Sequence, residues 1–214
     1  CTPPTAPPPR LIEWARRAHW IETQVFDSEE QFRQKVHSCL QSISAKIHST
    51  KAHSSFWNVT YEGNRIVDKS PKKETDIQPF VNCLLSDQML LSGIEVIPEF
   101  QTGAGDVDFV FAAQIKDVGI RKFCAEFKLA HSQNLAEGLW HQLPEYMRTT
   151  GATYGAYCVV CFGPEWISPV VKQSGHALDL FLTMVPLEIA QPEHDRIRSF
   201  VIDIEKQPTA SKRG

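Results

Sequence analysis

Three polar side chains interrupt two apolar segments of the sequence. Asp108 stands within the apolar run 106–113, and Glu126 and Lys128 alternate with apolar residues up to Leu129. Residues i and i+2 of a β-strand share a face, so Glu126 and Lys128 project together. Carboxylates beside an amine suit a Mg²⁺-dependent hydrolase, because the carboxylates hold the ion and its waters while the lysine orients water or stabilises developing charge. The same fragment also occurs as a surface ion pair on a half-solvated strand.

Hydrophobic periodicity predicts the elements that carry these residues. Helices are expected at 11–23, 28–49, 74–91 and 131–149, and strands at 94–100, 106–113, 119–129, 154–162 and 198–205. Residues 54–68 read as a strand or loop pair with a turn at 62–64, and Asp27 or Ser28 can cap the second helix. From residue 74 onward the order is helix, three strands, helix, strand. This order predicts an α/β fold whose hairpin-like sheet is completed by one crossover and flanked by helices.

Three short motifs follow one another on these elements. They are Gly103-Ala-Gly-Asp-Val-Asp108, Glu126-Phe-Lys128 and, on the next helix, Gln142-Leu-Pro-Glu-Tyr146. Together they closely resemble the PD-(D/E)XK nuclease superfamily, the restriction-endonuclease-like fold, and the last resembles the Q-x-x-x-Y motif of its RecB-like members. The resemblance covers about residues 69–163. It implies an αβββαβ core with a central mixed sheet flanked by helices.

The resemblance also implies roles for individual residues. It places Asp108 and Glu126 as ligands of Mg²⁺, for which Mn²⁺ can substitute, with the backbone carbonyl of Phe127 as a third ligand. Lys128 matches the catalytic lysine. The acidic residue of the first core helix, a direct or water-mediated metal ligand, corresponds to Glu74. The complete set of expected catalytic residues is Glu74, Asp108, Glu126, Lys128, Gln142 and Tyr146.

Some of these positions have competitors. Asp106 shares a strand face with Asp108, which is preferred because it lies deeper in the apolar run, so that Asp106 would cap the turn. Asp76 and Glu99 compete with Glu74. The basic cluster just before Glu74, made of Lys69, Lys72 and Lys73, is expected to reach a DNA backbone near the site, or to be a solvated helix start.

Charge is distributed unevenly along the 214 residues, whose formal net charge is −3. The first 73 residues hold 11 Lys+Arg against 7 Asp+Glu, and the remainder holds 11 against 18. The basic part is therefore the better candidate for holding phosphates, and the acidic part carries the expected metal site. A net negative charge thus does not exclude a DNA substrate.

The chain starts with Cys1 and a proline tract, without a secretory signal or an apolar run long enough to span a membrane. We interpret it as a piece of a larger protein with three parts. Residues 1–10 form a Pro-rich linker, residues 11–68 a helical extension or the end of a preceding domain, and residues 69–214 the nuclease-like domain.

The six cysteines lie mostly in apolar stretches, which favours reduced thiols in a cytoplasmic protein. Cys158 and Cys161 stand three apart on an expected strand, so they should point to opposite faces rather than form a metal or redox pair.

The residues and the resemblance together lead to one expected function and one rival. The expected function is a Mg²⁺-dependent DNA endonuclease that leaves 5′-phosphate and 3′-hydroxyl ends. By analogy, it would be the effector module of a larger bacterial protein in anti-phage defence, in contact with the other domains of that protein, and paired cuts would need a homodimer. The rival is a catalytically inactive nuclease-fold domain that binds nucleic acid or a protein partner.

Overall fold

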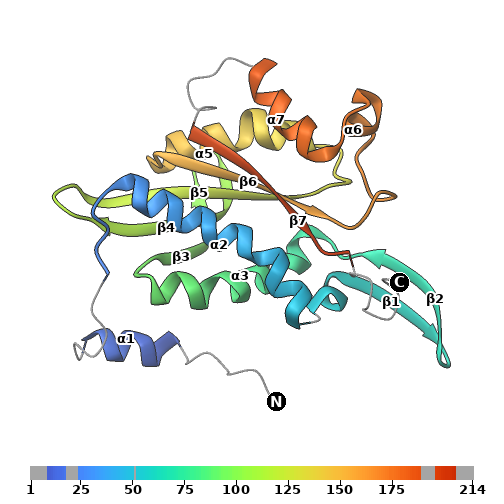
Figure 1. The fold of residues 1–214 in the computed structure, drawn as a ribbon, viewed down its shortest axis with the longest axis horizontal. Helices are drawn as coiled ribbons and strands as arrows, with labels where there is room; N and C mark the ends of the chain where they lie inside the picture. Colours follow the sequence, from blue (N-terminus) through green and yellow to red (C-terminus); the bar gives the residue numbers. More distant parts are fainter. Residues whose placement is uncertain (1–8, 18–23, 51, 189–195, 206–214) are drawn as a thin grey trace, which may run out of the picture.

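The computed structural model describes residues 9–17, 24–50, 52–188 and 196–205 (Figure 1). The helical segments are α1 (Pro9–Arg17), α2 (Glu29–Thr50), the 3-10 turn η1 (Ala52–Phe56), α3 (Glu74–Leu91), α4 (Leu135–Glu137), the π-helical segment η2 (Gly138–Gln142), α5 (Leu143–Thr150), α6 (Pro169–Ser174) and α7 (Leu178–Glu188). The strands are β1 (Trp57–Glu62), β2 (Arg65–Pro71), β3 (Glu95–Thr102), β4 (Gly105–Ile115), β5 (Gly119–Leu129), β6 (Tyr154–Cys161) and β7 (Ile197–Asp203).

A five-stranded mixed sheet forms the centre of the molecule, in the order β3-β4-β5-β6-β7. The first three strands are antiparallel neighbours, whereas β5, β6 and β7 are parallel. The parallel step from β5 to β6 needs a crossover, which α4, η2 and α5 supply. The predicted α/β architecture, a mixed sheet flanked by helices, is confirmed.

Two parts of the prediction change in detail. The helix expected at 131–149 starts only at Leu135, and its middle is the wider π-helical segment η2. Residues 54–68, left open between strands and loops, contain β1 and the start of β2, which pair antiparallel as a separate hairpin that projects beside the sheet (Figure 1). Residues 1–8 of the expected linker and residues 18–23 of the first expected helix lie outside the described residues.

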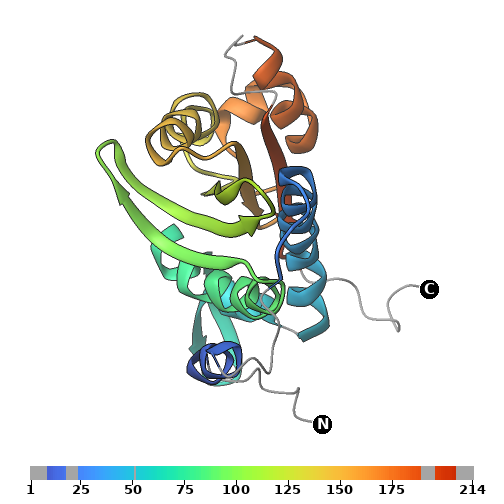
Figure 2. The same ribbon diagram turned by 90° about the vertical axis from the view of Figure 1, so that its left-hand side faces the viewer.

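The sheet separates two hydrophobic clusters, because successive residues of a strand point to opposite faces. Phe123, Ala125 and Phe127 of β5 join the cluster that contains the apolar residues of α2 and α3. Cys124 faces the other cluster, formed with α5 and α7. Figure 2 shows α2 on one side of the sheet and α5 on the other. The even-numbered residues of β5 therefore face α5.

Helix α2 packs in the hydrophobic core on one face of the sheet. Its start resembles a capping box, since the Gln31 N–H donates to Ser28 Oγ at 3.2 Å and Gln31 Oε1 accepts from the Asp27 N–H at 2.8 Å. Val36, Ile43 and other apolar residues of α2 are fully buried in the first cluster together with strand residues. The expected division at residues 68/69 thus does not coincide with a gap in the hydrophobic core.

The described helices include none that combines the length and the apolar character needed to cross a lipid bilayer.

Candidate active site

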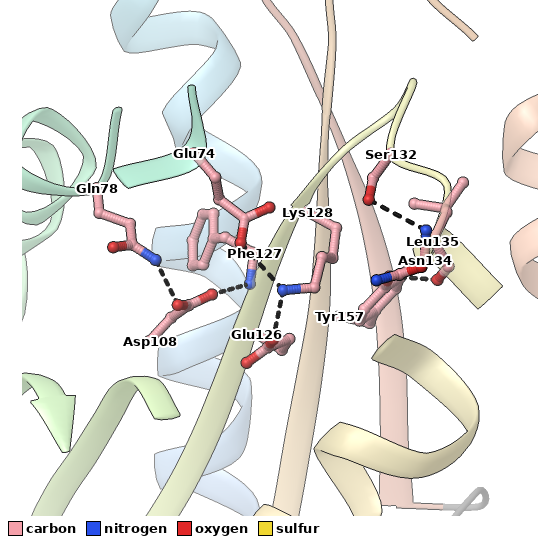
Figure 3. A network of polar contacts seen from close by, with 10 residues as sticks. All are labelled: Glu74, Gln78, Asp108, Glu126, Phe127, Lys128, Ser132, Asn134, Leu135 and Tyr157. Atoms are coloured by element: carbon pink, nitrogen blue, oxygen red, sulfur yellow. Dashed lines mark hydrogen bonds and ion pairs between the residues drawn. The ribbon is translucent and has the colours of Figure 1, made fainter. Parts of the chain in front are cut away.

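The site lies where β4 and β5 stop pairing. Their antiparallel ladder runs from Ile115 opposite Gly119 to Phe109 opposite Ala125, and the described register continues no further. The Phe127 N–H therefore lacks a backbone partner on β4. It donates instead to Asp108 Oδ2 at 2.6 Å, so the Asp108 side chain bridges the gap between the two strands (Figure 3).

Asp108 is held on both of its oxygens. Oδ1 accepts a hydrogen bond from Gln78 Nε2, one helical turn after Glu74 on α3. The residue is only 9% exposed. Burial, and secondly the charge of Glu126, raise the pKa of the Asp108 carboxyl well above its usual value, although the Phe127 N–H opposes the shift. A cation close to Asp108 and Glu126 would offset the repulsion between these two buried carboxylates.

Lys128 links a strand carboxylate to a helix carboxylate. Its Nζ lies 2.8 Å from Glu126 Oε1 and 3.0 Å from Glu74 Oε1 (Figure 3). Burial by itself lowers the pKa of Lys128, but the Glu126 and Glu74 charges outweigh it and raise the pKa above its ordinary value. The ammonium group is therefore charged at neutral pH and acts as a hydrogen-bond donor rather than as a base.

One carboxylate oxygen of Glu126 makes no hydrogen bond with the described residues. Glu126 is 2% exposed, and its Oε2 is buried without a hydrogen-bond partner among the described residues. Burial raises the pKa of Glu126, against the opposing effect of Lys128. An unsatisfied buried carboxylate oxygen is costly, so a ligand that supplies a positive charge suits this position.

The donors around this oxygen fit a hard divalent cation. Asp108 and Glu126 offer carboxylate oxygens, and the Phe127 carbonyl faces the same gap as its N–H, because both groups of a strand residue point to one neighbour. Asp108, Glu126 and the Phe127 carbonyl would therefore hold Mg²⁺. In the part of the chain that the structure describes, no three His, Cys, Asp or Glu side chains gather as a metal cluster.

Gly138 of η2 packs directly behind this group of residues. A Cβ atom on Gly138 would lie 2.7 Å from the Tyr157 hydroxyl and 3.3 Å from Lys128 Cε. The fully buried Tyr157 in turn donates a hydrogen bond from its hydroxyl to the Leu135 carbonyl (Figure 3). The π-helical turn, β6 and Lys128 are thus in mutual contact. The absence of a side chain at Gly138 thus leaves the space that Tyr157 and Lys128 occupy.

Tyr146 borders the same group of residues, and Gln142 lies beside it. The Tyr146 hydroxyl packs on Gly105, where a Cβ would be 3.1 Å away, and burial and the Glu126 charge raise the pKa of Tyr146. Gln142 and Tyr146 both line a pocket of about 340 Å³ between α5 and the turn before β4. Gln142 Oε1 is buried without a hydrogen-bond partner among the described residues. The structure therefore places Gln142 and Tyr146 in one pocket, with Tyr146 close enough to Glu126 for the carboxylate charge to raise its pKa.

Contacts and exposure distinguish the carboxylates that competed for the same predicted roles. Glu74 contacts Lys128, whereas Asp76 and Glu99 are exposed. Asp106 is exposed as well, and the turn before it is closed by Thr102, whose Oγ1 accepts from the Ala104 N–H at 3.1 Å. The expectation that Asp106 caps this turn is therefore wrong, because the hydroxyl of Thr102 performs that task.

The three expected DNA-binding lysines flank the start of α3. Lys69 on β2 places its Nζ 3.7 Å from the centre of the Trp57 ring, so the indole fixes its position. Lys73 directly precedes Glu74 and is exposed, while Lys72 is half-buried. The lysine cluster thus ends directly before Glu74, whose carboxylate contacts Lys128.

Sequence reasoning missed two features of the site. Gln78 stands four residues after Glu74 on the same helix face, and this i, i+4 spacing was the available signal. The contact of Gly138 with Tyr157 and Lys128 had no local signal, because it joins η2, β5 and β6. Cys158 and Cys161 face different hydrophobic clusters, as their spacing on a strand predicts.

Comparison with known proteins finds one family. The profile of a family described as "Domain of unknown function (DUF8371)" matches residues 32–164. The chain belongs to this family. The matched region includes most of α2, the hairpin and every residue of the candidate site. Searches of curated proteins and of solved structures found no match.

Proposed function

We propose that this member of a family without an assigned function is a Mg²⁺-dependent nuclease of the restriction-endonuclease-like superfamily that hydrolyses phosphodiester bonds in DNA. The observation that carries the proposal is the meeting of Asp108, Glu126 and Lys128 at the point where β4 and β5 part. The order α3, β3, β4, β5, α5, β6 and the mixed sheet are consistent with the αβββαβ core of that superfamily.

The residues of the site have distinct roles in this proposed reaction. Asp108 and Glu126 hold the cation, and Gln78 and the Phe127 N–H orient Asp108. A bound Mg²⁺ polarises a phosphoryl oxygen and lowers the pKa of a coordinated water. Lys128, kept protonated by its two carboxylates, donates hydrogen bonds to the attacking water or to the phosphate oxygens and stabilises developing negative charge.

Glu74 competes with the substrate for Lys128. The ammonium of Lys128 is shared between Glu126 and Glu74. With Glu126 engaged as a cation ligand, Lys128 would have hydrogen-bonding capacity available for a phosphate. Lys69, Lys72 and Lys73 lead along the chain to Glu74 and would hold the DNA backbone beside the site. We therefore expect the protein to bind DNA weakly in the absence of a divalent cation and more tightly in its presence.

Cleavage of a supercoiled plasmid and of a short labelled duplex tests the proposal. We expect cleavage with Mg²⁺ or Mn²⁺ that EDTA abolishes, and a loss of about 100-fold or more in Asp108→Asn, Glu126→Gln and Lys128→Met, since each removes a group that stabilises the transition state. Lys116→Ala, at an exposed lysine in the turn between β4 and β5, is the matched control and should cleave as the wild type does.

Cleavage that persists in EDTA or in Lys128→Met would contradict this mechanism. Metal-independent DNA binding by the wild type, without cleavage in the presence of either metal, would instead favour an inactive nuclease-fold domain. Circular dichroism of each variant shows that the fold is retained.

A further inference from the structure

A second polar cleft lies on the other face of the sheet. It is bounded by the first half of α2 and the start of β7 and has a volume of about 420 Å³. The residues that determine its charge are Glu30, Arg33, His37, Arg196 and Arg198. His37 packs against Phe123 and Phe200, which belong to the cluster on the α2 side, whereas Glu126 and Lys128 face α5. The cleft is therefore separate from the candidate active site.

The described residues that line the cleft carry a surplus of positive charge. Three guanidinium groups line it, and Glu30 is the only carboxylate among the described lining residues. Glu30 forms an ion pair with Nη2 of Arg33. Two of the three arginines are also ordered by aromatic rings, because Arg33 lies 4.7 Å from the ring centre of Tyr154 and Arg198 lies 5.3 Å from that of Phe200. Such stacking presents the planar guanidinium at low entropic cost.

Two residues that line this cleft each have a buried nitrogen atom without a hydrogen-bond partner among the described residues. Nε of Arg33 and Nε2 of His37 are buried without a hydrogen-bond partner in the ranges that the structure describes. Burial, and then the charges of Arg198 and Arg33, lower the pKa of His37 to about 4. The part of this shift that comes from Arg198 and Arg33 reports a concentration of positive charge beside His37, which a bound anion would offset.

We propose that this cleft binds a small phosphate ester, with the phosphate dianion held by Arg33, Arg198 and Arg196. Guanidinium groups bind phosphate oxygens through two parallel hydrogen bonds, which favours phosphate over a monovalent halide. The volume exceeds that of a phosphate group and leaves room for the organic part of the ester. A nucleoside monophosphate and a sugar phosphate both carry a phosphate monoester, so either could supply the group that the arginines bind.

Isothermal titration calorimetry with the whole chain tests the site in EDTA, at constant ionic strength set with chloride. The probes are inorganic phosphate, ribose 5-phosphate and AMP, with adenosine as the uncharged control. We expect binding of the two esters, no binding of adenosine, and a loss of at least about tenfold in affinity in Arg198→Gln and in Arg33→Gln, since tenfold equals the loss of one charge-assisted hydrogen bond. Arg65→Gln, at an exposed arginine on the hairpin, should bind as the wild type does.

The exposed Arg198 keeps the test decisive if Arg33→Gln does not fold. The imidazole NMR signals of His37 should shift on addition of ribose 5-phosphate in the wild type and in Arg65→Gln, but not in Arg198→Gln. Equal affinities in Arg198→Gln and the wild type would overturn the proposal. Tighter Arg198-dependent binding of a duplex without terminal phosphates would overturn it as well, because the arginines would then contact a nucleic-acid backbone. Since EDTA is present, neither result depends on nuclease activity.

Discussion

At the scale of single residues, the candidate site is a set of buried charges that partly neutralise one another. Asp108 and Glu126 both have raised pKa values because burial disfavours their charged forms. Lys128 supplies one positive charge for Glu126 and Glu74, so the group of residues remains short of cations. This deficit is the physical reason to expect a metal ion here rather than a structural ion pair.

Gln78 is the residue whose replacement tests the orientation of Asp108. Gln78→Leu removes the donor to Oδ1 and leaves a buried acceptor unsatisfied, which should lower the free energy of unfolding by about 1–3 kcal/mol. The Mg²⁺ concentration for half-maximal cleavage should also rise severalfold, because an unsupported Asp108 binds protons more readily. Gln114→Leu, at an exposed position of β4, serves as the control. An unchanged Mg²⁺ dependence would show that Gln78 has only a structural role.

At the scale of elements, η2 decides how closely the helical layer approaches β5 and β6. A π-helical turn inserts an extra residue into the hydrogen-bonding pattern, and such turns occur often at functional sites. Here the turn places Gly138 against Tyr157 and Lys128, so that a residue with a side chain would meet two buried neighbours.

Gly138→Ala tests this contact. The added methyl group would overlap the Tyr157 hydroxyl, so we expect a loss of about 1–3 kcal/mol in unfolding free energy, measured by urea denaturation. Displacement of Lys128 should also reduce cleavage at saturating Mg²⁺ by more than the loss of folded protein explains. Gly103→Ala is the matched control, because a Cβ there meets nothing within 4 Å. Full activity of Gly138→Ala would show that η2 does not position Lys128.

At the scale of the whole molecule, α2 and the sheet share one hydrophobic cluster across the predicted boundary at 68/69. We therefore expect one cooperative unfolding transition, with coincident curves from tryptophan fluorescence and far-UV circular dichroism. Ile43→Ala, at a residue of α2 with no exposed surface, should destabilise this single transition by about 2–5 kcal/mol.

The exposed Ile120, at 66%, provides the control for that experiment, since Ile120→Ala removes the same atoms without creating a cavity. Two separate transitions, with only the helical one shifted by Ile43→Ala, would show that residues 11–68 fold as an independent unit.

Elements with a local hydrophobic periodicity could be predicted from the sequence alone. The helix of α3, the strands β4, β5 and β6, and the shared face of Glu126 and Lys128 follow from repeats of 3.6 and 2 residues. These repeats report which face is buried, and the order of the elements that they define predicted the α/β architecture with flanking helices; the central mixed sheet was implied by the family resemblance.

Contacts between residues of different elements became known only from the folded structure. The choice of Glu74 over Asp76 and Glu99 depends on the packing of α3 beside the open end of the β4–β5 ladder. The contacts of Gln78 with Asp108, of Gly138 with Lys128, and of α2 with β7 at the second cleft join residues that lie 10 to more than 150 positions apart. Local periodicity holds no information about such pairs, because their contact energy exists only after the chain has folded.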